Sequence, residues 1–163
     1  MEIKFLVEED FVNYKKASMF IGFPNCSFKC NKDNGKQVCQ NYPLFCAPSK
    51  KVSVSYIIDR YCSNPITSAL VIGGLEPFDS WDDLIKLVTE FRKITDDDIV
   101  IYSGYYGREI TDRILELEKF PNIIVKFGRY FPGDEPHYDE VLGVKLASNN
   151  QYARRLDENK TKS

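Results

Sequence analysis

The sequence is poor in several residue types on which common active sites depend. Its 163 residues include one histidine, His137, one tryptophan and two methionines. A single imidazole excludes metal sites built from several histidines, and any Ser-His-Asp or Cys-His mechanism would depend on that one residue. We interpret His137 as a surface residue, because the loop around it contains glycine and proline.

The sequence also lacks a strong charge of one sign and any long apolar run. Its net charge of −2 gives no basic surface for nucleic acid and no polybasic patch for a membrane. No apolar run approaches the roughly 20 residues of a membrane-spanning helix. The start, Met1–Phe5, is charged where a signal peptide has an apolar core. We therefore expect a cytoplasmic protein without nucleic-acid or membrane partners.

Cysteine, by contrast, is present and clustered. Three of the five cysteines, Cys26, Cys30 and Cys39, lie in one short segment, and Cys46 follows closely. Extracellular disulfide frameworks usually contain an even number of cysteines, so this odd, clustered set indicates a metal site in a reducing compartment. Three thiolates favour a 4Fe-4S cluster with one open iron, whereas inclusion of Cys46 would give a closed zinc site. The cysteines alone leave both interpretations open.

The hydrophobic pattern predicts alternating strands and helices. Hydrophobic residues make up 43% of the chain, which is enough for one globular core. Continuous apolar runs predict buried strands at residues 17–23, 69–73, 98–103 and 122–127. Apolar residues at helical spacing predict helices at residues 53–62, from a Ser80 cap onward, and up to about residue 119.

Strands separated by helices predict an α/β fold with a mainly parallel sheet. A complete (β/α) barrel takes about 250 residues, so this chain can form a partial (β/α) barrel or an open doubly wound sheet. In both, ligands bind at the carboxyl ends of the strands, where the cysteine segment, Gly73–Gly74 and Ser103 all fall. We predict one domain over residues 1–153 and a charged, frayed tail over residues 154–163.

Three motifs together resemble the radical S-adenosylmethionine (SAM) superfamily. A strand leads into Cys26-x-x-x-Cys30, the third cysteine begins Cys39-Gln-Asn, and a later strand ends in Gly73-Gly-Leu-Glu-Pro. Two features depart from the usual pattern. Eight residues separate Cys30 from Cys39 where two are usual, and Leu75 is an extra residue in the Gly-Gly-Glu-Pro motif. The polar insert between the cysteines can bulge into solvent at small entropic cost.

Within the superfamily, the chain is most similar to the small activating proteins of anaerobic ribonucleotide reductase. There the third cysteine is typically followed by His-Asn or Gln-Asn, and a late Gly-Ser-x-Asn-Gln segment is common, to which Ala147–Gln151 is similar. The resemblance covers about residues 16–152 and implies a partial barrel of the radical SAM type. It also implies a large glycyl-radical enzyme, the anaerobic ribonucleotide reductase, as protein substrate. The implied electron donor is a protein such as flavodoxin or ferredoxin.

The resemblance implies a role for each motif. Cys26, Cys30 and Cys39 would each bind one iron of a 4Fe-4S cluster, and S-adenosylmethionine would chelate the fourth iron. One electron would then cleave the sulfonium bond, giving methionine and a 5′-deoxyadenosyl radical. Gly73 and Gly74 would let backbone approach the methionine moiety. The corresponding alternative is an ordinary strand-to-helix turn, in which glycines are common.

Further roles follow for single residues. Glu76 would accept a hydrogen bond from the ammonium group of S-adenosylmethionine. Ser103 would contact its ribose or carboxylate, although a small residue before a turn is an equal alternative. Val38 would present backbone to the adenine. Lys126 interrupts an apolar strand, and we expect it to contact a carboxylate because a buried lysine is costly unless paired.

Two other functions compete with the activating protein. One is a radical SAM enzyme that acts on a small molecule, such as the deazapurine-forming carboxylases, which usually carry extra segments. The other is a non-catalytic zinc or iron–sulfur module in which Cys46 completes the metal site. In the radical SAM interpretation Cys46 and Cys62 are bystanders.

Overall fold

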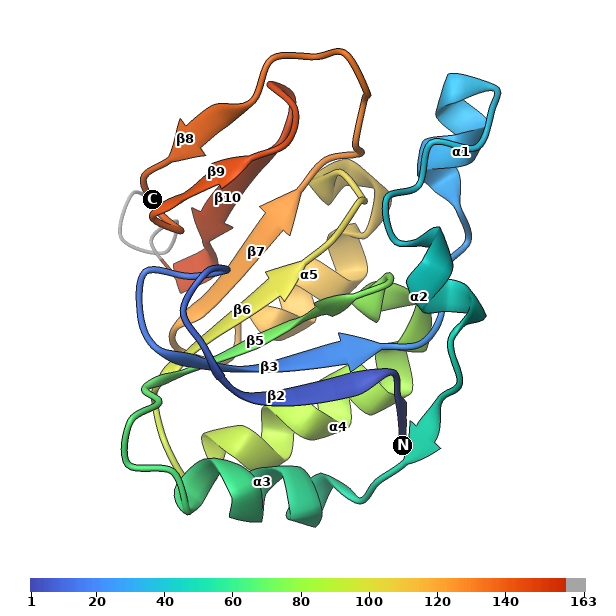
Figure 1. The fold of residues 1–163 in the computed structure, drawn as a ribbon. Coiled ribbons are helices and arrows are strands. Elements are labelled where there is room, and N and C mark those ends of the chain that lie inside the picture. The colour runs from blue at the N-terminus through green and yellow to red at the C-terminus, as the bar shows by residue number, and fades with distance from the viewer. Residues whose placement is uncertain (158–163) are drawn as a thin grey trace.

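The structure, a computed structural model, describes residues 1–157 and is built around a six-stranded sheet (Figure 1). The strands are ordered β10-β7-β6-β5-β3-β2. The inner four run parallel: β3 (Ser18–Phe23), β5 (Ala69–Gly74), β6 (Asp98–Tyr102) and β7 (Ile123–Phe127). The predicted mainly parallel α/β sheet is confirmed, and it is open, with edges at β2 and β10.

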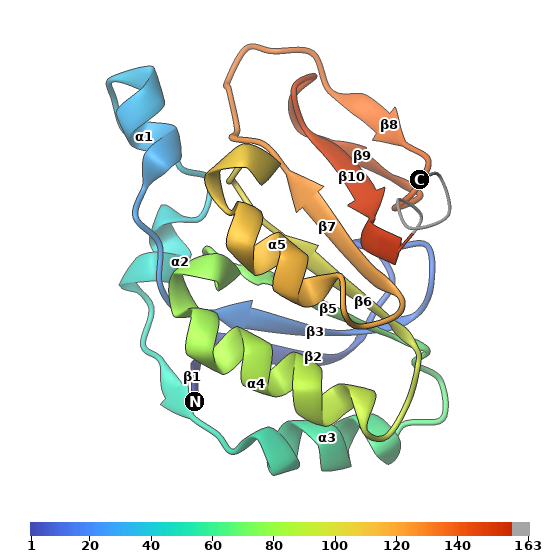
Figure 2. The same ribbon diagram turned by 180° about the vertical axis from the view of Figure 1, so that it is seen from behind.

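Three helices connect the parallel strands and cover one face of the sheet, which is in front in Figure 2. They are α3 (Val54–Cys62), α4 (Trp81–Arg92) and α5 (Thr111–Leu117). The Ser53 hydroxyl caps α3 by accepting from the Tyr56 amide at 3.0 Å. The cap predicted at Ser80 is not made: α4 continues from η1 (Pro77–Ser80), and the Ser80 hydroxyl instead accepts from the side-chain amide of Asn25 at 2.9 Å.

Both faces of the parallel strands are buried, since alternate residues of a strand point to opposite sides. The larger core lies between sheet and helices and includes Ile21, Ile72 and Phe91. A smaller core on the other face joins Val71, Val100 and Ile124 to Tyr14 and Leu142 from loops and to Leu146 from the short strand β9 (Val144–Leu146). Each fully buried aliphatic side chain stabilises the fold by about 1.5–3 kcal/mol. This double burial explains why the strands are continuous apolar runs.

The edge strands were not predicted from the sequence. They are β2 (Phe5–Asp10) and β10 (Tyr152–Arg155), and each pairs antiparallel with its neighbour. Both contain charged residues, as edge strands commonly do, and this obscures their pattern. Other short elements are β1 (Glu2–Ile3), α1 (Lys29–Asn34), α2 (Tyr42–Cys46), β4 (Lys50–Lys51), η2 (Gly107–Glu109), β8 (His137–Asp139) and β9 (Val144–Leu146).

Two expectations about the second half of the chain need correction. The predicted frayed tail began at Arg154, but Arg154 and Arg155 belong to β10, and Leu156 is fully buried. Ladder hydrogen bonds to β7 and the burial of Leu156 hold this segment in place; residues 158–163 of the predicted tail lie outside the described residues. His137 is not a plain surface residue, because it is half-buried and its Nε2 lies 2.6 Å from the Gln151 carbonyl oxygen. Over residues 1–157, none of the helices has the length and apolar character needed to cross a membrane.

Candidate metal centre

The three clustered cysteines lie beyond the carboxyl end of β3. Cys26 is in the loop after the strand, Cys30 is in the short helix α1 (Lys29–Asn34), and Cys39 precedes α2 (Tyr42–Cys46). Phe28 begins α1 in a left-handed conformation with φ of 57°, and its amide donates to the Cys26 sulfur at 3.3 Å. All three thiols are half-buried and line the same cleft.

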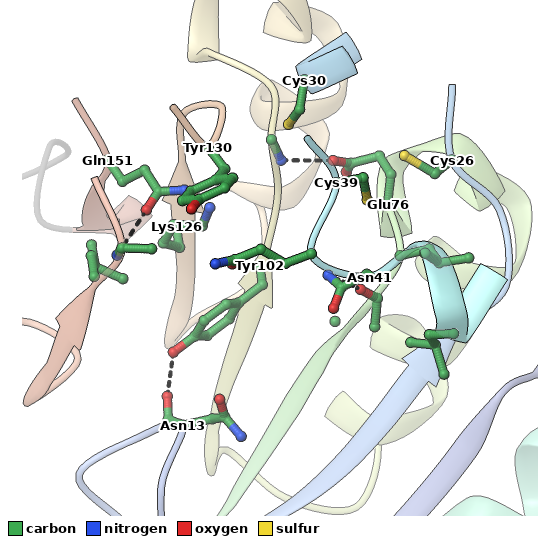
Figure 3. Close-up of a pocket in the computed structure, with 18 of the residues that line it drawn as sticks. Asn13, Cys26, Cys30, Cys39, Asn41, Glu76, Tyr102, Lys126, Tyr130 and Gln151 are labelled. Carbon is green, nitrogen blue, oxygen red and sulfur yellow. Dashed lines mark hydrogen bonds between the residues drawn. The ribbon is translucent and has the colours of Figure 1, made fainter. Parts of the chain in front are cut away.

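This cleft lies at the carboxyl ends of the parallel strands and has a volume of about 480 Å³. That volume is in the usual range for small-molecule sites. The cysteine segment forms one wall, and Tyr130 and Gln151 belong to the other (Figure 3). Tyr102 lies between them and donates from its hydroxyl to the Asn13 carbonyl. Segments far apart in the sequence therefore meet around one space.

The glycine pair at the end of β5 lets backbone line the cleft. Gly74 has φ of +81°, and a Cβ there would lie 2.7 Å from the Cα of Gly22, so only glycine fits. Gly73 also lines the cleft. The side-chain amide of Asn41, two residues after the third cysteine, donates to the Gly74 carbonyl at 3.0 Å. This hydrogen bond joins the cysteine segment to the glycine turn.

Glu76 is a buried carboxylate beside the thiols. Its Oε1 accepts from the Phe78 amide at 3.1 Å and from the Ser103 hydroxyl at 3.0 Å, and its Oε2 accepts from the Gly104 amide at 2.7 Å. A Cβ on Gly104 would lie 3.6 Å from Glu76 Oε2 and 3.9 Å from the Cys30 sulfur, which places this carboxylate near the cysteines. Burial raises the pKa of Glu76 to about 7, although these three hydrogen bonds oppose the rise.

Lys126 brings a positive charge to the same cleft from β7. The residue is 8% exposed, and its ammonium donates to the Gly128 carbonyl at 3.2 Å. The prediction that Lys126 contacts a carboxylate is wrong. Within residues 1–157 it forms no ion pair, and its ammonium is hydrogen-bonded to a backbone carbonyl instead. Burial lowers the pKa of Lys126 to about 8, while the nearby Glu76 and Cys30 act in the opposite direction. A buried ammonium group with N–H donors that are not hydrogen-bonded within residues 1–157 would be stabilised by an anionic ligand.

The thiols fit a soft metal that binds thiolates. Burial raises the pKa of Cys26 to about 12 and also raises the pKa of Cys30, and the Cys39 thiol contributes to both shifts. Metal binding would release these protons, since the thiolate is the ligand. Among the described residues, no three His, Cys, Asp or Glu side chains are arranged to hold a single ion. The cysteines of a 4Fe-4S cluster bind different irons, so their sulfurs need not meet at one point.

Comparison with known families gives the metal centre its class. A family model described as a 4Fe-4S single cluster domain matches residues 15–151. The chain belongs to this family. The match includes all three cysteines of the cleft and every parallel strand of the sheet. No curated protein and no solved structure matched the chain.

Several residues predicted to bind S-adenosylmethionine line the cleft of this 4Fe-4S domain, and others do not. Gly73, Gly74 and Glu76 line it together with the three cysteines. Ser103 is 2% exposed and lies behind Glu76, with its hydroxyl turned to that carboxylate. Val38 is half-buried beside Cys39 and is not among the residues that line the cleft.

Cys46 and Cys62 are exposed and do not line the cleft of the 4Fe-4S domain. Cys46 ends α2 and Cys62 ends α3, so neither lies in the segment that carries Cys26, Cys30 and Cys39. Cys46 is the fourth cysteine in sequence order, and the rest of α2 lies between it and Cys39. Cys26, Cys30 and Cys39 remain the candidate ligand set.

Sequence reasoning gave no site role to Asn31, Asn41 or Tyr130. Tyr130 lines the cleft, and its carbonyl accepts from the Asn34 side chain at 3.4 Å. Gln151 was noted only as part of a motif. Its Oε1 accepts from the amides of Ala147 and Ser148 at 3.1 and 3.2 Å, which folds the late segment against the cleft. The Gln-Asn pair after the third cysteine was the one available signal for Asn41.

Proposed function

We propose that this 4Fe-4S protein is a radical SAM enzyme that reductively cleaves S-adenosylmethionine to methionine and a 5′-deoxyadenosyl radical. One observation carries the proposal. Three thiols, a glycine turn that only glycine can form, and two oppositely charged buried side chains line or border one cleft at the carboxyl ends of parallel strands. When bound, a 4Fe-4S cluster with one open iron supplies the electron for that cleavage.

The residues of the cleft suit a ligand with an amino-acid end. Cys26, Cys30 and Cys39 would hold three irons and leave the fourth for the ligand. Among the described residues, Oε2 of Glu76 accepts one hydrogen bond, from the Gly104 amide, so its second lone pair would receive the ligand ammonium. Lys126 would donate to the ligand carboxylate, because within residues 1–157 its ammonium has a single hydrogen-bond acceptor, the Gly128 carbonyl. The two side chains would thus orient the methionine moiety by opposite charges.

Other residues would orient the remainder of the ligand. The backbone of Gly73 and Gly74 would contact the methionine moiety where no side chain intervenes. Ser103 would act through Glu76, because its hydroxyl is committed to that carboxylate. The Val38 amide donates to Asn31, so its carbonyl rather than its amide would face the adenine. In this proposal the open sheet is a shortened partial barrel of the radical SAM type.

The protein substrate in this proposal is a large glycyl-radical enzyme, the anaerobic ribonucleotide reductase. The radical would take a hydrogen atom from a backbone glycine of that partner. An electron donor such as flavodoxin or ferredoxin would reduce the cluster in an anaerobic cytoplasm. The open sheet, with edges at β2 and β10, supports a partner that completes the site.

The first test is anaerobic reconstitution with iron and sulfide, followed by EPR of the reduced protein with and without S-adenosylmethionine. We expect a reduced 4Fe-4S signal whose shape changes when S-adenosylmethionine is added, because the ligand binds the open iron. A cluster signal that ignores S-adenosylmethionine would contradict the enzymatic proposal. One tightly bound zinc per chain and no cluster would support a structural module instead.

The second test asks for the partner. The reduced protein is mixed with S-adenosylmethionine and the large subunit of an anaerobic ribonucleotide reductase, and glycyl-radical EPR is recorded. We expect a protein-based radical together with 5′-deoxyadenosine, and a variant of the large subunit that lacks its radical glycine is the control. Turnover that needs a small molecule and leaves no radical on the large subunit would favour a small-molecule enzyme.

A further inference from the structure

The insert between the second and third cysteines closes on itself through one side chain. Asn31 follows Cys30 directly, and its Oδ1 accepts from the amide of Val38 at 2.7 Å and from the amide of Cys39 at 2.9 Å. The first residue of the insert therefore binds its last residue and the third cysteine. Both donors are backbone N–H groups, so the oxygen of the Asn31 amide must face them.

The interior of the insert forms a compact turn. It continues α1 to Asn34 and then reverses at Gly35, which has φ of +68° and whose amide donates to the Lys32 carbonyl at 3.3 Å. A left-handed glycine is the usual way to end a helix. Because the two ends are held together by Asn31, the eight residues between the cysteines add a protrusion without separating Cys39 from Cys30.

The outer part of the insert is anchored to the opposite wall of the cleft. The Asn34 side chain donates to the Cys30 carbonyl at 2.8 Å and to the Tyr130 carbonyl at 3.4 Å. Asp33 lies 2.5 Å from Nε of Arg129, which is 6% exposed and also holds Glu109 through both terminal nitrogens. These contacts hold the outer part of the insert in position, while the two hydrogen bonds to Asn31 hold the backbone at Cys39 in position.

We propose that Asn31 is a positioning residue that places the Cys39 thiol for cluster binding and so makes the widened cysteine spacing usable. The inference rests on the cluster part of the proposed function and is independent of S-adenosylmethionine. Without the Asn31 carbonyl, the amides of Val38 and Cys39 lose their acceptor and the third ligand is free to move. Partners that orient metal ligands in this way typically change metal affinity by about 10- to 100-fold when removed.

The test compares three variants after anaerobic reconstitution. Asn31→Ala removes the acceptor, Asn31→Asp keeps an oxygen in its place, and Asn64→Ala is the matched control. Asn64 accepts from the Ile66 amide at 2.9 Å in the loop before β5, at the other end of the sheet. The measured quantities are iron per chain, the rate of iron release to a chelator, and the reduction potential of the cluster.

We expect Asn31→Ala to release iron about 10-fold faster or more, and Asn64→Ala to match the wild type. Asn31→Asp should retain iron within about twofold of the wild type. Its cluster should have a lower reduction potential, because the added negative charge lies beside a cluster ligand and net charge tunes these potentials. Urea unfolding of the cluster-free forms checks that each variant folds.

Three results would overturn the inference: normal iron retention in Asn31→Ala, equal iron loss in Asn31→Ala and Asn64→Ala, or an unchanged potential in Asn31→Asp. The reduction potential of Asn31→Asp tests the inference even if Asn31→Ala fails to fold. A wild-type cluster that forms but does not respond to S-adenosylmethionine defeats the proposed enzyme and leaves the iron comparison valid. The two failures are therefore distinguishable.

Discussion

The two ends of the parallel sheet each contain a buried carboxylate, and the two have opposite surroundings. Asp98 at the start of β6 is 5% exposed, and Glu76 after the end of β5 is 6% exposed. Asp98 accepts from the Tyr14 hydroxyl at 2.6 Å and pairs with Lys16 at 3.0 Å and Arg155 at 3.1 Å. Burial by itself raises the pKa of Asp98, but these partners outweigh it and hold the pKa at about 2.

Within residues 1–157 the hydrogen-bond donors to Glu76 are all neutral, and burial raises the pKa of Glu76 to about 7. Lys126, a positive charge at the same end, is itself buried and forms no ion pair within residues 1–157. The two carboxylates are almost equally inaccessible to solvent, yet their pKa values shift in opposite directions, because Asp98 has cationic partners whereas Glu76 lies deeper in the protein and forms no ion pair within residues 1–157. We infer that the amino end of the sheet uses its buried carboxylate for stability, whereas the carboxyl end leaves Glu76 and Lys126 available to a ligand.

The largest test of this contrast is loss of the cysteines. Replacing Cys26, Cys30 or Cys39 by serine should abolish the 4Fe-4S cluster, because each binds a different iron. The free energy of unfolding of the cluster-free protein should change by less than about 1 kcal/mol. Iron analysis, EPR and urea unfolding measure both effects. Cys46→Ser is the control and should keep the cluster. Loss of the cluster in this variant would indicate a site with four cysteine ligands.

The opposite result is expected at the amino end. Asp98→Asn should lower the free energy of unfolding by about 2–4 kcal/mol, because Arg155 and Lys16 lose a partly buried partner. Cluster binding should remain normal. Urea unfolding of the cluster-free protein gives the first quantity and iron per chain the second. The exposed Asp59→Asn is the matched control; an equal loss of stability there would remove the special role of Asp98.

The acid side of the stability profile sharpens the same contrast. The pKa of Asp98 is lowered to about 2 from an ordinary value of 3.8, so its contribution is complete above about pH 4 and is lost as the pH falls toward 2. At about 1.4 kcal/mol per pKa unit, the loss is about 2 kcal/mol. Denaturant unfolding between pH 5 and 2 should show it in the wild type and not in Asp98→Asn. Identical slopes would contradict the assignment.

The smallest expected effect concerns Glu76. Glu76→Gln keeps one acceptor oxygen but removes the charge proposed to receive the ligand ammonium. The affinity for S-adenosylmethionine should fall about tenfold or more, as expected for a hydrogen bond to a charged group. Titration of the reduced cluster followed by EPR measures this, with the exposed Glu116→Gln as control. An unchanged affinity would mean that the carboxylate only ties the ends of β5 and β6 together.

The inner fold was predictable, because its strands are buried on both faces and read as continuous apolar runs. Ala69–Gly74 and Ile123–Phe127 match the predicted strands to within a residue. The edge strands were missed because one side of each is unpaired and charged residues break the pattern. Arg154 and Arg155 were assigned to a frayed tail, yet they belong to β10, which pairs with β7 and is followed by the buried Leu156.

The site was predictable only in its residue types. The Cys26–Cys39 spacing and the glycine pair indicated which side chains belong together, since both follow strands of one parallel sheet. The partners of those side chains were not predictable. Ser103 turns to Glu76 instead of the cleft, and Lys126 meets a backbone carbonyl where a carboxylate was expected. Such partners come from segments distant in sequence, and no local pattern encodes them.

By itself, the sequence determined the ligand chemistry and the class of the sheet. Thiol count and spacing are local properties, and the period of the apolar residues follows from the geometry of a single strand or helix. Only the tertiary structure decided that Asp98 would be paired with cations and Glu76 would not, and that Asn31 would bring the ends of a long insert together. The reason is physical: pKa shifts and ligand positions depend on distances and burial, which exist only once separate segments have packed against one another.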